Sequence, residues 1–173
     1  MSILKAAVFG CFVAANAFAL QLDFESMSCD FTQSVQSGKK VAVYSGTVIV
    51  KKPLKALWSY KKPIKKEVYV GKNEIVIFEP EIDQATVQKN KSGFAIEEIL
   101  KNAKQKNAKQ YEAVIDGTKI TFELKDGFFD RLEYEDNLAN SVTIKLTGCK
   151  KNIKLDDGIF VFKPSASVDI INK

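Results

Sequence analysis

The sequence contains no histidine and almost no arginine, and each scarcity excludes a class of function. Without histidine there can be no Ser-His-Asp triad, no Cys-His pair and no histidine-ligated metal. Arg131 is the only arginine among 26 basic residues, whereas base reading and bidentate phosphate contacts favour the planar guanidinium. Glycine-rich phosphate-binding motifs are absent as well. We therefore expect no nucleic-acid partner, no metal and no cofactor.

Paired carboxylates are the remaining candidates for acid–base chemistry. The pairs are Glu97-Glu98, Asp156-Asp157, and Glu133 with Glu135 on one strand face. Charged faces are usually just solvated, so these pairs do not predict a glycosidase. We expect that the protein is not an enzyme.

Long apolar runs are also absent, apart from one near the start of the chain. Lys5 precedes an apolar run over 6–15, and Ala17 and Ala19 are the small residues typical of a signal-peptide cleavage site. Residues 6–19 fall short of the roughly 20 that a helix needs to cross a bilayer, so an uncleaved anchor is the weaker alternative. We expect a signal peptide over 1–19, cleaved after Ala19, and a single exported domain over 20–173.

Cysteine is scarce too, and export leaves two of the three. Cys11 lies in the signal peptide, whereas Cys29 and Cys149 remain in an oxidising compartment. A bridge requires Cα atoms within about 7 Å, which the sequence cannot show. Cys29 and Cys149 are therefore either a disulfide or two free thiols.

The rest of the chain has a dominant hydrophobic period of two, which predicts strands. Within 40–52, for example, Val48 and Val50 share a face with Lys52. Turn pairs such as Asp116-Gly117 separate these segments. We expect a mainly β fold, a curved antiparallel sheet with strands at 29–36, 40–52, 54–61, 67–71, 74–79, 84–89, 110–116, 118–125, 128–135, 141–147, 159–163 and 167–171.

One segment, 92–107, has helical spacing instead, with Phe94, Ile96, Ile99 and Leu100 on one face. Curved sheets of this size enclose either a packed core or an apolar ligand site. The helix is accordingly either a plug that completes the core or a mobile lid over a cavity. Composition does not choose between the two.

An ordered series of short motifs resembles the LolA family of outer-membrane lipoprotein carrier proteins. The motifs are F-T-Q at 31–33, G-T-V-I-V-K-K-P at 46–53, W-S-Y-K-K-P at 58–63, F-E-P-E-I-D-Q at 78–84 and F-K-P at 162–164. Each piece is short, but the order and spacing are specific, and they span nearly all of the exported domain.

The resemblance implies a periplasmic chaperone whose incomplete, half-open barrel of about eleven strands shelters lipoprotein acyl chains beneath a short helical lid. It implies cargo received from an inner-membrane LolCDE-type ABC transporter and carried to the outer membrane, in many species to a LolB-type receptor. We expect a monomer. The alternative is a periplasmic binding or adaptor protein for a fatty acid, phospholipid or glycolipid on the same scaffold.

The resemblance also assigns residues. The family's cavity arginine falls on Lys52, which lacks the planar fork and implies a weaker or differently built latch; an exposed strand-end lysine is the alternative. Trp58 matches the family's tryptophan and is either a cavity wall or a core anchor. Family members have a longer helix before F-T-Q, whereas 20–28 has room for at most about two turns. We expect acyl chains to contact Val48, Val50, Ala56, Trp58 and Tyr60, and a lid formed by Lys52, Phe94, Ile96, Ile99 and Leu100.

Overall fold

The computed structural model describes residues 22–53, 55–90 and 96–173. The expected signal peptide and Phe94 lie outside these residues. Within them, no helix has the length and apolar character needed to cross a membrane.

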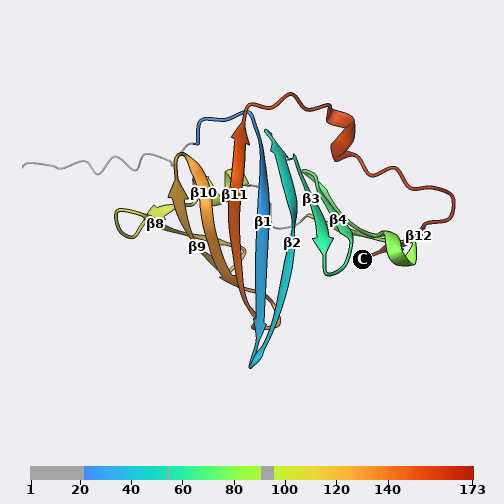
Figure 1. Ribbon diagram of the computed structural model, residues 1–173, viewed down its shortest axis with the longest axis horizontal. Coiled ribbons are helices and arrows are strands. Elements are labelled where there is room, and N and C mark those ends of the chain that lie inside the picture. Colours follow the sequence, from blue (N-terminus) through green and yellow to red (C-terminus); the bar gives the residue numbers. More distant parts are fainter. Residues whose placement is uncertain (1–21, 54, 91–95) are drawn as a thin grey trace, which may run out of the picture.

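Twelve strands form one curved sheet, in the order β12-β6-β5-β4-β3-β2-β1-β11-β10-β9-β8-β7 (Figure 1). The sheet does not close on itself, so the expected mainly β, half-open fold is confirmed. The strands are β1 (Ser26–Ser37), β2 (Lys40–Lys51), β3 (Lys55–Lys62), β4 (Lys66–Val70), β5 (Glu74–Glu79), β6 (Gln84–Lys89), β7 (Lys104–Gln105), β8 (Gln110–Ile115), β9 (Thr118–Lys125), β10 (Phe128–Glu135), β11 (Ser141–Lys151) and β12 (Asp169–Asn172).

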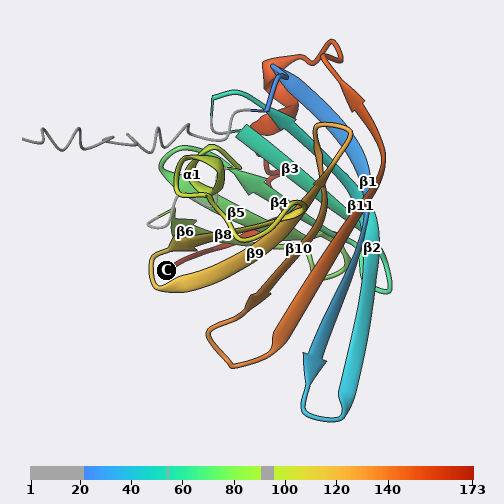
Figure 2. The same ribbon diagram turned by 90° about the vertical axis from the view of Figure 1, so that its left-hand side faces the viewer.

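Tight turns set the antiparallel register. Asp116-Gly117 joins β8 to β9 and Asp126-Gly127 joins β9 to β10, and all four residues have positive φ. Two-residue hairpin turns of this type match the right-handed twist of the strands. The twist accumulates across the sheet and curves it around its apolar face (Figure 2).

Three local expectations are wrong. Residues 159–163 form no strand, because the Asp156 carboxylate accepts the Gly158 N–H at 2.6 Å and begins the 3-10 helix η2 (Asp157–Phe160). The segment 167–171 supplies β12, but β12 pairs with β6 in parallel. The helix expected over 92–107 does not reach its predicted end, since α1 spans Ile96–Lys101 and Lys104–Gln105 pairs with β8.

The main core lies on the concave face of the sheet, beneath α1 (Figure 2). Phe24, Phe122 and Phe129 are almost wholly buried there. From α1, Ile99 and Leu100 join the same core, each 5% exposed. The helix therefore takes the place that a second sheet would occupy in a sandwich.

A disulfide joins the two central strands. Cys29 on β1 and Cys149 on β11 are bonded, with Cα atoms 4.1 Å apart and 120 residues between them in sequence. The register of β1 against β11 shifts between Ser28 and Asp30, so the bridge lies at a bulge. It links an early strand to a late one at the middle of the sheet.

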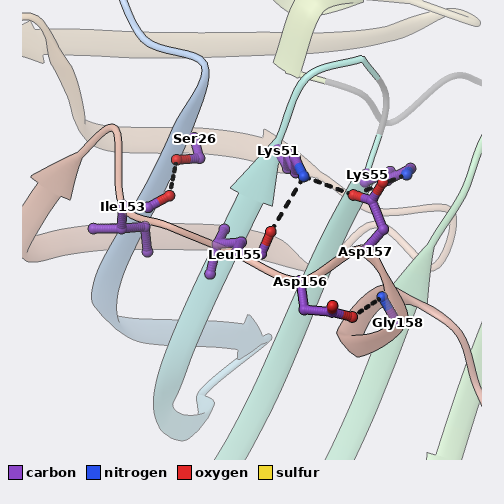
Figure 3. A network of polar contacts seen from close by, with 8 residues as sticks. All are labelled: Ser26, Lys51, Lys55, Ile153, Leu155, Asp156, Asp157 and Gly158. Atoms are coloured by element: carbon purple, nitrogen blue, oxygen red, sulfur yellow. Dashed lines mark hydrogen bonds and ion pairs between the residues drawn. The ribbon is translucent and has the colours of Figure 1, made fainter.

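The C-terminal arm, residues 152–168, leaves the end of β11, passes the ends of β1, β2 and β3, and continues to β12 (Figure 1). Ser26 Oγ donates to the Ile153 carbonyl at 2.6 Å, and Lys51 Nζ donates to Leu155 O at 3.2 Å (Figure 3). Lys51 and Lys55 also pair with the Asp157 carboxylate, and these hydrogen bonds lower its pKa. The arm is thereby fixed to β1, β2 and β3.

An aromatic contact fixes the far part of the arm. The Phe162 ring lies 5.5 Å from that of Tyr69 on β4 and 5.1 Å from that of Phe78 on β5. This face of β4 and β5 is opposite the concave one, because side chains alternate along a strand. The arm therefore covers the sheet from outside.

Because the disulfide restrains a loop of 120 residues, its removal should destabilise the sheet. Replacing both cysteines by serine is expected to lower the free energy of unfolding by roughly 2–5 kcal/mol. Urea unfolding of the oxidised, reduced and double-serine proteins measures this. Equal midpoints for the three would show that the bridge does not stabilise the fold.

Candidate functional site

A cavity of about 260 Å³ lies between the concave face of the sheet and α1. Its walls are aliphatic and aromatic apart from a few hydroxyl and amide groups. The lining residues are Met27, Gln33, Val48, Trp58, Tyr60, Val68, Val70, Ile75, Ile77, Gln88, Ile99, Ile120, Phe129, Leu132, Tyr134, Ile144 and Leu146. Aspartate, glutamate, lysine and arginine are all missing from this set.

One wall is a cross-strand row. Val48 on β2 faces Trp58 on β3, Trp58 faces Val68 on β4, and Val68 faces Ile77 on β5. Directly opposed residues project from the same face of a sheet, so the row presents four apolar side chains to one space. The curvature of the sheet brings residues of β9, β10 and β11 to the other side of that space.

The structure brings together most of the predicted binding residues. Val48, Trp58 and Tyr60 line the cavity. Val50 and Ala56 face each other across β2 and β3 and belong to the core beside it. Trp58 also contacts the core, since its ring lies edge-on to Phe31 at 5.1 Å, so both of its expected roles apply.

The predicted lid residues divide in a similar way. Ile99 reaches the cavity, and Leu100 is buried in the adjoining core. Ile96 begins α1. Phe94 lies outside the described residues.

Lys52 contacts the N-terminal segment, which is defined here as residues 22–25. Its ammonium group donates to the Leu22 carbonyl at 3.0 Å and lies 4.9 Å from the centre of the Phe24 ring. Its backbone N–H donates to the Glu25 carbonyl at 2.9 Å. Residues 22–25 form no helix, and Leu22 and Phe24 are buried in the core. Lys52 therefore holds an extended segment that covers part of the core.

A polar cluster around Tyr60 occupies one end of the cavity. The Tyr60 hydroxyl donates to Gln33 Oε1 at 2.8 Å, and burial raises the pKa of Tyr60, so the phenol stays protonated. Burial likewise raises the pKa of Tyr134, which lines the same cavity. Lys66 Nζ lies 4.4 Å from the centre of the Tyr60 ring, and desolvation there lowers the pKa of Lys66. Gln33, Tyr60 and Tyr134 therefore offer hydrogen bonds in the lining without adding a charge.

The described residues do not assemble a metal site or an acid–base pair in this cavity. No cluster of three or more potential metal-ligating side chains occurs among them. Glu133 accepts from Arg131 at 2.6 Å, and Asp157 holds the C-terminal arm. These two carboxylates, which the sequence singled out, thus have structural partners elsewhere.

Sequence reasoning missed more than half of the lining. Most of the missed residues are on β4, β5, β9, β10 and β11, in strands that were predicted. Alternation divides each strand into two faces but does not say which face is concave. Trp58 and Tyr60 could have supplied that choice, because the register carries their face to Val68 and beyond.

Comparison with known proteins shows the family to which the chain belongs. Residues 23–126 match the family described as outer membrane lipoprotein carrier protein LolA. The chain belongs to the LolA family. The outer-membrane lipoprotein carrier protein of Helicobacter pylori (strain HPAG1) is 37% identical over 150 residues, which cover 86% of this chain and 81% of that protein. The protein of the same name from Campylobacter jejuni is 33% identical, covering 89% of this chain and 90% of its own.

Solved structures show how widely this fold of the LolA family occurs. An uncharacterized conserved protein from Thermus thermophilus superposes with a TM-score of 0.59, covering 90% of this chain and 94% of that one, at 7% identity. A DUF1329 family protein from Desulfovibrio piger gives a TM-score of 0.51 at 10% identity, covering 80% and 90%. These likenesses concern the fold alone.

If Lys52 holds the N-terminal segment, Lys52→Met should release it. The change removes a charged hydrogen bond worth roughly 1.5–3 kcal/mol, so amide exchange at Phe24 and Glu25 should accelerate at least about tenfold. Lys52→Arg should restore protection, and Lys89→Met, at an exposed position on β6, should leave it unchanged. Unaltered exchange in Lys52→Met would refute this role.

Proposed function

We propose that this LolA-family chain is a chaperone that shelters the acyl chains of lipoproteins in the cavity beneath α1. The observation that supports it most directly is the lining, which is mainly apolar and, among the described residues, contains no charged side chain. Lipoprotein carriers at 33–37% identity supply the class of cargo. The proposed contacts are Val48, Trp58 and Tyr60, with Val50 and Ala56 behind them.

The physical need is to keep acyl chains out of water. Each buried methylene contributes about 0.8 kcal/mol, so a lipoprotein cannot cross an aqueous compartment with its chains exposed. A non-directional, weakly discriminating cavity binds many acylated cargoes and also releases them. The proposed carrier buries the acyl chains reversibly, and no covalent bond is made or broken.

We propose that α1 is the part that moves, and the cavity volume supports this. Pockets for drug-sized ligands measure about 300–1,000 Å³, so the present 260 Å³ is too small for several acyl chains. The strands are joined by a continuous hydrogen-bonded ladder, whereas α1 spans six residues. Displacement of α1 with Ile99 and Leu100 would open the cavity, which supports a lid rather than a permanent plug.

The route follows from the class of cargo. The proposed carrier acts in the periplasm as residues 20–173, after cleavage at Ala19. It takes acylated lipoproteins from an ATP-driven transporter of the inner membrane and delivers them to the outer membrane, directly or through a receptor. We propose that it acts as a monomer.

A charge placed at the lid should abolish binding and leave the sheet folded. Ile99→Glu brings a carboxylate into the cavity, where burying it without a partner is costly. We expect affinity for a purified triacylated lipoprotein to fall at least about tenfold. Gel filtration of the protein–lipoprotein complex and a fluorescent acyl probe both measure it.

Val114→Glu is the matched control, because Val114 is a 56% exposed aliphatic residue on β8. This variant should bind like the wild type. Circular dichroism should show an intact sheet in both variants. Full binding by a folded Ile99→Glu protein would overturn the lid, and preference for free fatty acid or phospholipid over lipoprotein would overturn the cargo.

A further inference from the structure

Five hairpin turns lie at one end of the strands of the sheet, and we name this row of turns the turn rim. They are 38–39, 63–65, 80–83, 116–117 and 136–140, and the antiparallel register places all of them at the same end of the strands. Exposed aliphatic side chains gather here: Val41 at 58%, Val43 at 56%, Ile64 at 51%, Ile82 at 63% and Leu138 at 82%. Nothing in the fold explains their exposure.

Lysines lie in two neighbouring hairpins of this rim. The β1–β2 hairpin carries Lys39 and Lys40, and the β3–β4 turn, K-K-P-I-K-K, carries Lys61, Lys62 and Lys65. All five are exposed, and neither 36–43 nor 60–66 contains a carboxylate. The outer turns are different, because each contains an aspartate. The basic tips, defined as residues 39–43 and 61–65, therefore combine five exposed lysines with the exposed Val41, Val43 and Ile64.

The two tips belong to the neighbouring strands β2 and β3. Lys62 is paired with Ser45, so the β3–β4 turn begins two residues from Val43 on the neighbouring strand. Lys66 folds back over the Tyr60 ring and lies 5.9 Å from the centre of the Tyr44 ring, which fixes the base of the turn. The β1–β2 hairpin projects beyond the rest of the sheet (Figure 1). The β1–β2 tip thus projects from the sheet, and the β3–β4 tip is held at its base by Lys66.

We propose that the basic tips dock the protein on the surface of a bilayer that contains anionic phospholipid. Lysines attract anionic head groups, and an adjacent aliphatic side chain inserts at the boundary between head groups and acyl chains. Neither signal alone gives stable binding, so both the lysines and the aliphatic side chains are needed for docking. A protein partner fits less well, because protein interfaces are enriched in arginine and aromatic residues and depleted of lysine.

Docking at the turn rim would bring the polar end of the cavity to the membrane. Tyr60 lines the cavity and directly precedes the basic turn, so acyl chains leaving at that end would meet the bilayer at once. This use of the surface rests on the proposed carrier function. The docking itself does not, because it can be measured with empty protein.

The test is co-sedimentation of cargo-free residues 20–173 with vesicles of phosphatidylcholine, with and without phosphatidylglycerol. Wild-type protein should bind the anionic vesicles at least about tenfold more tightly, and rising ionic strength should weaken that binding. Replacing Lys61, Lys62 and Lys65 by glutamate should reduce it at least about tenfold. Ile64→Asp should also reduce it, whereas Ile64→Leu should not.

The matched control replaces Lys72, Lys125 and Lys154 by glutamate, an equal change of charge on exposed lysines away from the turn rim. It should keep most of the binding. Equal loss in the two triple variants, or no preference of the wild type for anionic vesicles, would overturn the proposal. So would normal vesicle binding by the tip variant combined with failed transfer from the transporter, since the tips would then contact a protein. Acyl-chain binding measured in parallel keeps these outcomes separate from failure of the carrier function.

Discussion

The concave face of the sheet is the constraint on which the rest of the structure depends. Twelve strands bend around an apolar face that no second sheet covers in the described part of the chain, and part of that face is left unfilled. Water must still be kept away from this face, because a large exposed apolar surface promotes association with other proteins. The small helix α1 and the N-terminal segment held by Lys52 do this together. A cover of so few residues can be displaced without unfolding the sheet.

A loosely filled cavity gives up packing energy, and contacts outside the cavity lining stabilise the sheet. The Cys29–Cys149 disulfide restrains its centre, and the C-terminal arm fixes its convex face through Lys51 and Phe162. None of these contacts uses the cavity. The sheet is thus stabilised by contacts outside the cavity lining, which allows the cavity to remain loosely filled.

Much of the fold could be predicted because strand alternation and Asp-Gly turns are local signals. The arm could not, since its apolar residues 159–163 mimic a strand, and only the Asp156 cap and the Phe162 contact decide otherwise. The site was predicted in part. Trp58 and Tyr60 were found through motifs, whereas Phe129 and Ile144 depend on which way the sheet bends. The partner of Lys52 was hidden because an extended segment carries no periodic signal.

The central claim is that this cavity carries acylated cargo. Native mass spectrometry of the mature protein isolated from its own periplasm, with fragmentation of whatever is bound, tests it most directly. A fraction of the protein bound one-to-one to an acylated lipoprotein, released when α1 carries Ile99→Glu, is the predicted result. A free fatty acid, phospholipid or glycolipid in place of the lipoprotein would contradict the account.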